Sequence, residues 1–489
     1  MTTASPPSRL SNATLGRIAA GVARPDYDRA TLRTGIVHFG PGAFHRAHQA
    51  FHVDRLLKAD PRWGICDVAL RGTSITDALT AQDGLFTIAE MRSAPAYRVV
   101  GSIREAFAAR SQAEDVLARL RAETVQAVTM TVTENGYCLT RSGDLDTGRA
   151  EIAHDLAAPQ APMSLIGWLV EGLAQRRRAG LPPYAMISCD NVADNGARLK
   201  RAVVQFAQAR DPDLARWIEG EAHVPSTMVD SITPAGDEAL KARVAARLGV
   251  LDQIPVQREP YVQWVMEDSP GMPGPDWAAA GVTVTRDVAG YEQAKLRILN
   301  GAHSTLAYLG LLRGRKTTRD AMADAMLARF ARALVGEDIA PSLTPPPGLD
   351  LPAYIDTVLE RIANPAITHQ LSQIAWDGSL KLPYRLFGPI EAALEAGRPL
   401  DRLAVPIAAW MRFVRARARD GGELIDPLRG RLLELGAATT GEAANDTMLF
   451  LGLDGVFPRA LAHAARFSLA VAQAYEAIGD AGALPGDGW

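Results

Sequence analysis

The sequence predicts an α/β protein in which a domain with a mainly parallel β-sheet is followed by a largely α-helical domain. At 489 residues the chain exceeds the size of about 250–300 residues at which a single hydrophobic core stops growing. Short β-rich runs alternate with helical patterns over residues 1–286, whereas residues 287–489 are almost entirely helical in pattern. We therefore expect two domains with these boundaries.

The first predicted strand is TGIVHFG at 34–40, a buried apolar run. A Pro41–Gly42 turn follows it, and AFHRAHQAFHVDRLL at 43–57 has the pattern of an amphipathic helix. A second strand, GICDVAL at 64–70, comes about one helix later. This strand–helix–strand order is the building block of a parallel sheet.

Two later β-rich runs end in polar residues. AVTMTVT at 127–133 is followed by Glu134 and Asn135, and YAMISCD at 184–190 is followed by Asn191. Open α/β sheets bind their ligands outside the carboxyl ends of the strands, so these three residues are candidates for a binding site.

The second domain begins where the β-rich pattern ends. A Pro/Gly-rich segment at 268–277 precedes one more β-rich run, GVTVTRDV at 281–288. Residues 291–312 and 322–336 then carry apolar residues at helical spacing, and Pro-rich residues 340–352 interrupt the helices.

The composition excludes several classes of protein. The formal net charge is −3, from 52 basic and 55 acidic residues, so no basic field attracts nucleic acid. The N-terminal residues lack the apolar core of a signal peptide, and no apolar run is long enough to span a bilayer. We therefore expect a cytoplasmic protein without a membrane partner. The three cysteines have no disulfide or C-x-x-C spacing and are expected to be reduced, mostly buried thiols.

A first candidate for chemistry is Gly40-x-Gly42, at the predicted strand-to-helix turn. Glycines there let backbone N–H groups approach a pyrophosphate, but the third glycine of the dinucleotide fingerprint is replaced by His45, and a purely structural turn is the alternative. Arg46, one turn into the helix, could reach a phosphate or remain solvated. No acidic residue ends the second strand, where the chain reads Arg71-Gly72-Thr73-Ser74, so NAD and NADP both remain open.

His45, His48 and His52 have helical spacing that could gather three imidazoles around a metal. No carboxylate or Cys completes such a set. We predict packing or cofactor contacts for these residues and no metal.

The strongest constellation lies in 291–303, where Glu292, Lys295, Asn300 and His303 fall within an arc of about 140° on an ideal α-helix. Only six of the 52 basic residues are Lys, which makes a Lys in an apolar stretch conspicuous. The alternative is a Lys that reaches water, an Asn–Gly turn and a core His.

Six blocks resemble the mannitol dehydrogenase family, in chain order over residues 34–460. They are GPGAFHRAHQ (40–49), TVTENGYC (131–138), SCDNVADNG (188–196), PSTMVDSITP (225–234), KLRILNGAHS (295–304) and DGSLKLP (377–383). The resemblance implies an N-terminal Rossmann-type NAD(P)-binding domain, a mainly helical C-terminal domain and a substrate cleft between them.

The resemblance also implies roles for individual residues. Lys295 is the expected acid/base, Asn191 and Asn300 hold the reacting oxygen, His303 positions the substrate, and Glu292 governs proton exchange with solvent. Asp230 and Lys381 match substrate-site positions. The expected cofactor-binding residues are Gly40, Gly42, Phe44, Arg46, Arg71, Glu134 and Asn135.

This chemistry suits the residue types. Two amide donors can stabilise charge on an alcohol oxygen, and a Lys desolvated to a pKa of about 7–8 can exchange the hydroxyl proton near neutral pH. No metal is then required.

Within the family, Lys295-Leu296-Arg297 and Lys381-Leu382-Pro383-Tyr384-Arg385 resemble fructuronate reductases. Arg297 or Arg385 could pair with a sugar-acid carboxylate, although each could instead form a surface or interdomain ion pair. Ser231 departs from the Arg that the family usually has after Asp230.

These features together predict an NAD(P)-dependent secondary-alcohol dehydrogenase that reduces D-fructuronate to D-mannonate with NADH, and the reverse. Interconversion of fructose and mannitol is the alternative substrate assignment, and a cofactor-binding sensor without turnover is the alternative of another class. The expected partner is a small sugar acid or polyol, and we expect a monomer or a weak homo-oligomer.

Overall fold

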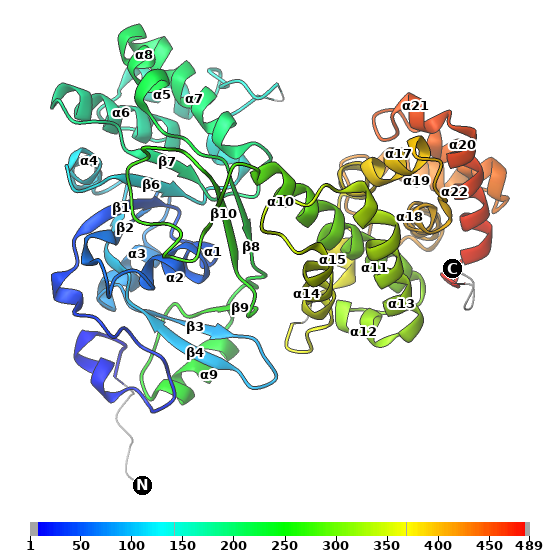
Figure 1. Ribbon diagram of the computed structural model, residues 1–489, viewed down its shortest axis with the longest axis horizontal. Helices are drawn as coiled ribbons and strands as arrows, with labels where there is room; N and C mark the ends of the chain where they lie inside the picture. The colour runs from blue at the N-terminus through cyan, green and yellow to red at the C-terminus, as the bar shows by residue number, and fades with distance from the viewer. Residues whose placement is uncertain (1–7, 141, 368, 485–489) are drawn as a thin grey trace. The chain divides into compact units, whose positions relative to one another are not determined.

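The computed structural model describes residues 8–140, 142–367 and 369–484 (Figure 1). By its internal contacts the chain divides into two compact units, Met1–Val288 and Ala289–Trp489. Among the described residues, no helix has the length and apolar character needed to cross a membrane.

A five-stranded sheet forms the centre of the N-terminal unit, in the order β5-β2-β1-β6-β7 with every pair parallel. Its strands are β1 (Thr34–Phe39), β2 (Gly64–Ala69), β5 (Ile103–Ala108), β6 (Ala127–Met130) and β7 (Ala185–Ser188). The predicted α/β class with a mainly parallel sheet is confirmed. The chain leaves β1 toward β2 on one side and later places β6 on the other, so β1 and β6 flank a topological switch point, where such sheets bind ligands.

Two smaller sheets accompany the main one. One has the order β11-β10-β8 and the other β4-β3-β9, each with one parallel and one antiparallel pair. Their strands are β3 (Phe86–Glu90), β4 (Ala96–Val100), β8 (Thr227–Asp230), β9 (Val256–Arg258), β10 (Gln263–Glu267) and β11 (Thr283–Thr285).

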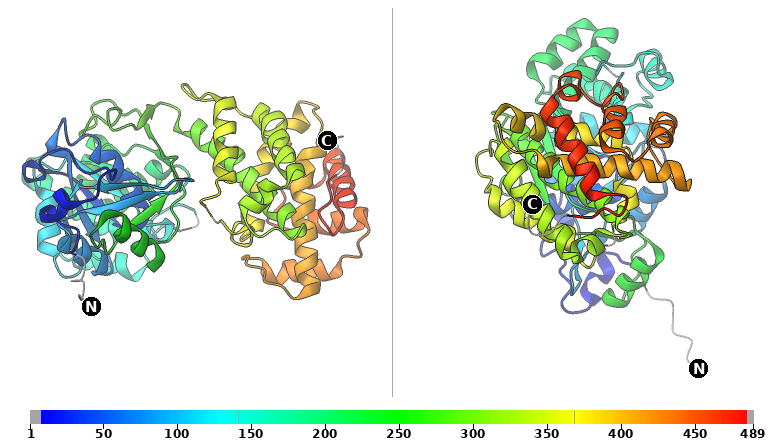
Figure 2. Two further views of the ribbon diagram at one scale, coloured as in Figure 1. Left: turned by 90° about the horizontal axis from the view of Figure 1, so that it is seen from below. Right: turned by 90° about the vertical axis from the view of Figure 1, so that its right-hand side faces the viewer.

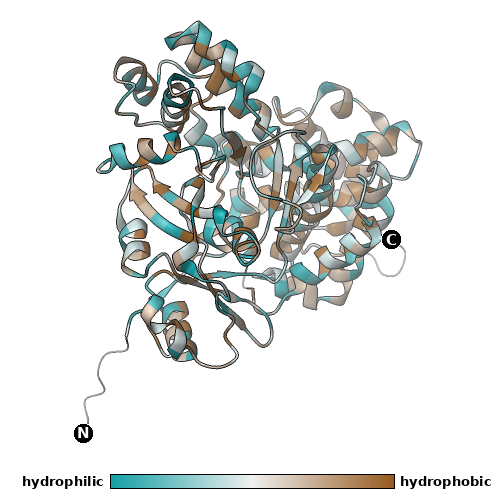
Figure 3. Cartoon of the chain, turned by 60° about the vertical axis from the view of Figure 1, so that its left-hand side comes forward, coloured by the Kyte–Doolittle hydropathy of each residue, from teal (hydrophilic) through white to brown (hydrophobic). Residues whose placement is uncertain are grey.

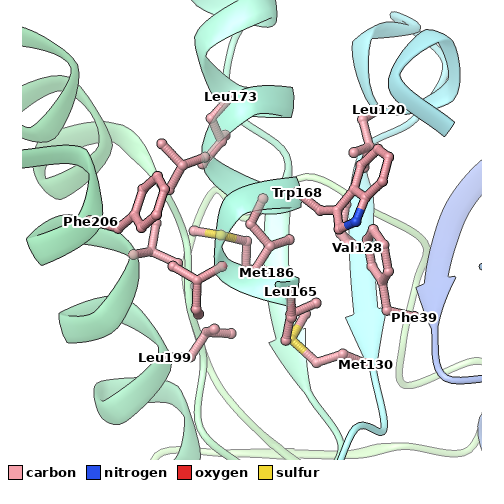
Figure 4. Close-up of a cluster of buried hydrophobic side chains, with 14 of the residues drawn as sticks. Phe39, Leu120, Val128, Met130, Leu165, Trp168, Leu173, Met186, Leu199 and Phe206 are labelled. Carbon is pink, nitrogen blue, oxygen red and sulfur yellow. The ribbon is translucent and has the colours of Figure 1, made fainter. Parts of the chain in front are cut away.

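Helices cover both faces of the main sheet, because its strands carry apolar residues on both sides. Val37 and Phe39 belong to the cluster that includes Trp168, and Figure 4 shows Phe39 and Trp168 in it, whereas the preceding Ile36 packs into the cluster on the other face. The three cysteines are buried and free, as predicted. The helices of this unit are α1 (Ala43–Ala47), α2 (Gln49–Asp54), α3 (Ser74–Ala81), α4 (Ala113–Arg121), α5 (Ala150–Ala157), α6 (Leu165–Arg178), α7 (Asn195–Arg210), α8 (Pro212–Glu221) and α9 (Glu238–Leu248), with 3₁₀ turns η1 (Asn12–Arg17), η2 (Arg29–Thr31), η3 (Pro61–Trp63) and η4 (Glu134–Tyr137).

Two predicted elements are shorter than the sequence pattern indicated. The strand expected at 127–133 ends at Met130, because the Asp190 carboxylate accepts the backbone N–H groups of Val132 and Thr133 and draws them out of the ladder. The single helix expected at 43–57 is broken at His48, whose ring donates a hydrogen bond to the Gln263 carbonyl at 2.8 Å.

Among the described residues of the C-terminal unit, all the named elements are helices or helical turns, and Figure 2 shows the unit from two further sides. Residues 301–310 of α11 (Asn300–Leu312) are all buried, so this helix forms the core of the unit. It packs against α18 (Asp401–Asp420), which in turn packs against α22 (Ala465–Ile478). The other helices are α10 (Val288–Ala294), α12 (Thr318–Ala323), α13 (Ala325–Ala333), α14 (Leu351–Ala363), α15 (Leu371–Ile374), α16 (Gly378–Leu382), α17 (Gly388–Glu395), α19 (Arg429–Ala438), α20 (Ala443–Leu451) and α21 (Arg459–Ala462), with a 3₁₀ turn η7 (Ala340–Ser342). Hydrophilic and hydrophobic residues alternate along its outer helices, as Figure 3 shows, which is typical of amphipathic helices.

In the described part of this unit, three π-helical turns interrupt the regular helices: η5 (Lys295–Leu299), η6 (Leu334–Ile339) and η8 (Pro383–Phe387). η5 contacts both η6 and η8. π turns inside α-helices occur frequently at functional sites, since the wider turn re-aims the side chains around it.

Candidate functional site

The turn after β1 has the geometry of a cradle for a pyrophosphate. Gly40 has a φ of +96°, and a Cβ there would collide with the Thr131 carbonyl of the neighbouring segment. Gly42 is exposed, and the nearest atom to a Cβ built on it is the Gly40 oxygen at 3.9 Å. The first glycine is therefore required by the fold, and the second leaves open space beside the backbone.

His45 occupies the place of the third fingerprint glycine by turning into the protein. Its ring is fully buried, stacks on His38 with 3.4 Å between centroids, and places Nε2 3.0 Å from an oxygen of Asp67. Burial raises the pKa of Asp67 to about 7 and lowers the pKa of His45 well below its ordinary value. Asp67 is thus a core residue in β2 and is not placed to bind a ribose at the strand end.

His48 and His52 pack inside the protein. Packing was one of the two roles that the sequence predicted for them, beside cofactor contacts. The His52 ring donates to the Ala280 carbonyl at 2.9 Å, and both rings lie against Trp264. Phe44, at the edge of the turn, is partly buried and stacks on the His48 ring.

The expected phosphate contact of Arg46 is corrected by the structure. Its side chain is only 4% exposed and donates hydrogen bonds to the carbonyls of Ile254 and Pro41. Burial lowers the pKa of this guanidinium to about 10. Arg46 therefore supports the turn from inside through Pro41 and does not present its charge at the turn surface.

Three other predicted cofactor residues and Asn191, which was predicted to hold the reacting oxygen, are exposed at the same edge of the sheet. Arg71 follows β2, Glu134 and Asn135 follow β6, and Asn191 follows β7. Because all the strands are parallel, their carboxyl ends share one edge with the Gly40 turn.

Two residues that hold this edge together were not predicted. Besides accepting Val132 and Thr133, Asp190 accepts the Tyr137 hydroxyl at 2.7 Å. Asn195 donates to the carbonyls of Asp190 and Thr227 and accepts the Thr227 N–H, which joins the Asn191 loop to β8. The block SCDNVADNG contains both residues, but their partners are distant in sequence and carry no local signal.

Asp230 is the last residue of β8 and is 5% exposed. The next residue, Ser231, donates its hydroxyl to the Tyr261 carbonyl at 3.0 Å. Ser231 thus contributes a local loop contact at the position where the family usually has Arg.

In the helical unit, Lys295 is the first residue of the π turn η5 and is 9% exposed. Glu292 lies in the preceding helix, and Asn300 and His303 begin α11 after the turn. A π turn holds more residues than an α turn, so the arc calculated at a constant angle per residue does not apply across 295–299. The side chains after the turn are rotated relative to an ideal helix.

Arg385 is partly buried and, among the described residues, pairs with no carboxylate. It donates to the Ser304 hydroxyl at 2.8 Å and to the Asn300 carbonyl at 3.3 Å. Burial lowers its pKa to about 10. Arg385 therefore holds a positive charge beside the first turn of α11, the turn that carries His303.

Arg297 has different surroundings. It donates to the carbonyl of Ser342 at 2.9 Å, and a Cβ on Gly388 would lie 2.8 Å from its guanidinium. Burial lowers its pKa, and the Glu391 carboxylate opposes that shift. These contacts tie η5 to its neighbours, which is the role of a structural residue.

Lys381 lies in α16, half-buried, with Nζ 3.9 Å from the Asp377 carboxylate. Burial lowers its pKa, and the nearby Arg385 charge lowers it further. Lys381 and Arg385 are thus close enough for each to raise the positive potential at the other.

Comparison with known proteins shows the family of the chain. The family model described as the mannitol dehydrogenase Rossmann domain matches residues 34–278, and that of the mannitol dehydrogenase C-terminal domain matches residues 287–479. The D-mannonate oxidoreductase of Escherichia coli K12 is 41% identical over 471 residues, covering 94% of this chain and 96% of the relative.

Two solved structures are also similar. A D-sorbitol dehydrogenase in substrate-free form has a TM-score of 0.91 and 33% identity, covering 97% of this chain and 100% of the other. The Pseudomonas fluorescens mannitol 2-dehydrogenase in ternary complex with NAD and D-mannitol has a TM-score of 0.78 and 34% identity, covering 96% of each chain. The chain therefore belongs to the mannitol dehydrogenase family of oxidoreductases.

Proposed function

We propose that this oxidoreductase interconverts D-fructuronate and D-mannonate with NAD(H). The observation that carries the choice of substrate is Arg385, a partly buried guanidinium without a carboxylate partner among the described residues. A buried charge without a counter-ion is costly, and a bound carboxylate would supply one. The 41% identity to a D-mannonate oxidoreductase supports the same choice.

The turn at Gly40 and Gly42 fits the pyrophosphate of a dinucleotide, since Gly42 is exposed and the nearest atom to a Cβ built there is the Gly40 oxygen at 3.9 Å. Phe44, Arg71, Glu134 and Asn135 are the proposed neighbours of the bound cofactor. When bound, NADH supplies the hydride for the keto carbon. The absence of an acidic residue in Arg71–Ser74 leaves room for NADP as a slower alternative.

Lys295 is the proposed acid/base. In reduction, its ammonium donates a proton to the keto oxygen as negative charge develops there, and in oxidation its neutral amine accepts the hydroxyl proton. Asn191 and Asn300 are the proposed amide donors to that oxygen, which they stabilise without changing their own protonation.

The remaining residues are assigned to substrate and proton handling. His303 and Asp230 are proposed to hold substrate hydroxyl groups, and Glu292 to pass protons between Lys295 and solvent. Lys381 and Arg385 are proposed to bind the carboxylate. Arg297, which we expected as a second carboxylate partner, is a weaker candidate because its guanidinium is engaged with Ser342.

Initial rates test this function directly. D-fructuronate, D-tagaturonate, D-fructose and D-xylulose are each measured with NADH and NADPH, and the largest kcat/KM is expected for D-fructuronate with NADH. A larger kcat/KM for D-fructose would favour a mannitol 2-dehydrogenase. Tight NADH binding without turnover of any keto compound would favour the cofactor-binding sensor.

A further inference from the structure

Two imidazole rings in the helical unit lie in contact with each other, and their nitrogens have no hydrogen-bond partner among the described residues. The rings of His303 and His369 meet nearly at right angles, with centroids 5.6 Å apart. Neither ring makes a hydrogen bond to a described residue, and Nδ1 of His369 is buried. Buried polar atoms are nearly always hydrogen-bonded in folded proteins, so Nδ1 of His369 lacks a partner that a bound group could supply.

The backbone is hydrogen-bonded at His369 and two residues after it, whereas the His369 side chain has no hydrogen bond to a described residue. The Thr318 N–H donates to the His369 carbonyl at 3.0 Å, and the Leu371 N–H donates to the Lys316 carbonyl at 2.9 Å. The position of the imidazole beside His303 therefore follows from the packing of this segment against the start of α12.

Positive groups surround the two rings. Burial lowers the pKa of His303 well below its ordinary value, and the charges of Arg385 and Arg361 act in the same direction. Burial also lowers the pKa of His369, with a further contribution from Lys381. Two described carboxylates, Asp377 and Asp426, act on the charge of Lys381.

Those carboxylates have other partners. Asp426 accepts the Ser379 N–H and hydroxyl and the Leu428 N–H, and Asp377 lies 3.9 Å from Lys381. They partly offset the charge of Lys381 and leave the imidazoles and Arg385 without an anion. The surroundings therefore favour a negatively charged ligand group beside the rings.

We propose that His369 is a further substrate-binding residue, whose imidazole N–H donates a hydrogen bond to the carboxylate of the sugar acid beside Lys381 and Arg385, and so helps to select acids over neutral ketoses. The proposal rests on the proposed function, since it names a contact within the same site. A neutral imidazole always carries one N–H donor, so His369 need not be protonated to serve in this way.

The test compares three variants in steady-state kinetics with NADH. His369→Ala removes the donor, His369→Gln retains an amide N–H, and His463→Ala removes an exposed histidine of the same unit as a control. For D-fructuronate, His369→Ala is expected to raise KM by about 10- to 100-fold with a smaller change in kcat, because a hydrogen bond to a charged group is lost. His369→Gln should recover part of that loss, and His463→Ala should match the wild type. The NADH dissociation constant and the circular dichroism spectrum check that the variants are folded.

The two proposals fail in different ways. Turnover of D-fructose but not D-fructuronate by the wild type would reject the proposed function and, with it, the carboxylate as the partner of His369. If the wild type prefers D-fructuronate but His369→Ala keeps KM within twofold, the function stands and His369 has no role in binding. An equal loss for D-fructuronate and D-fructose would overturn the selection of acids.

Discussion

The two units each contain a cluster of histidines, and the clusters differ in the polar partners that their rings have in the protein. In the N-terminal unit, the rings of His38, His48 and His52 are hydrogen-bonded to the protein, and His45 pairs with Asp67. In the helical unit, His303 and His369 touch each other and make no hydrogen bond to a described residue. The N-terminal rings are fully buried, whereas His303 is 8% exposed and His369 is partly buried. Single nitrogens without a hydrogen bond occur in both clusters, at His45 and His52 as well as at His369. The difference is that every ring of the N-terminal cluster has at least one polar partner in the protein, whereas neither ring of the helical cluster has one among the described residues.

The largest effect on turnover is expected at Lys295. Lys295→Ala should lower kcat for D-fructuronate reduction by about 10³-fold, since general acid–base catalysis contributes 10²–10⁴-fold. The NADH dissociation constant, measured by fluorescence, should change little. Lys316→Ala, at an exposed lysine of the same unit, is the matched control. Turnover within tenfold of the wild type in Lys295→Ala would reject Lys295 as the acid/base.

The next largest effect separates the two arginines. Arg385→Leu should lower kcat/KM for D-fructuronate by about 100-fold, because truncating one partner of a buried charge pair costs about 2–5 kcal/mol. Arg297→Leu should instead lower the melting temperature, since the Ser342 carbonyl loses its donor. Calorimetry and initial rates on both variants measure the contrast. The reverse pattern would make Arg297 the carboxylate partner.

A smaller effect is expected at the glycine turn, where substitutions of Gly42 and Gly40 should have different consequences. Gly42→Ala has room in the protein but intrudes where a pyrophosphate would lie, so NADH should bind about tenfold more weakly with an unchanged melting temperature. Gly40→Ala should lower the melting temperature instead, because of its φ of +96° and the nearby Thr131 carbonyl. Unaltered NADH binding in Gly42→Ala would argue against a cofactor at this turn.

The smallest effect on turnover is expected at Asp67. The quantity to measure there is the free energy of unfolding as a function of pH. Its folded-state pKa of about 7 exceeds the value of about 3.9 for an unfolded Asp, so the folded state keeps a proton that the unfolded state releases. The resulting stabilisation is complete below about pH 4 and is lost as pH rises toward 7. The Asn of Asp67→Asn does not titrate, so the variant does not lose stability in this way as pH rises. Its unfolding free energy relative to the wild type should therefore increase from pH 5 to pH 7 in urea titrations. A parallel pH dependence of the two proteins would show that Asp67 does not titrate in this range.

Much of the N-terminal fold was predictable because strand and helix periodicities are local. The Gly40 turn and the polar strand ends were found in the same way. The break at His48 and the inward turn of His45 and Arg46 were not, because they depend on partners such as Asp67 and Ile254 that only the folded chain brings near.

In the helical unit, the segment carrying Lys295 and His303 was recognisable from polar residues in an apolar pattern. The π turn was missed, since a shift in backbone hydrogen bonding leaves no hydrophobic signature. His369 was also missed. It lies 66 residues beyond His303, in a segment without clear periodicity, and only the packing of that segment places the two rings together.

The contrast between the clusters can be tested in one experiment, ¹⁵N NMR of protein labelled at its nine histidines. D-mannonate is added to protein saturated with NADH, a pair that cannot react because both are reduced, and His303→Gln and His369→Gln provide the assignments. The account predicts that D-mannonate shifts the ring signals of His303 and His369 and leaves those of His38, His45, His48 and His52 unchanged. Shifts confined to the N-terminal cluster, or unchanged signals from His303 and His369 at saturating D-mannonate, would contradict it.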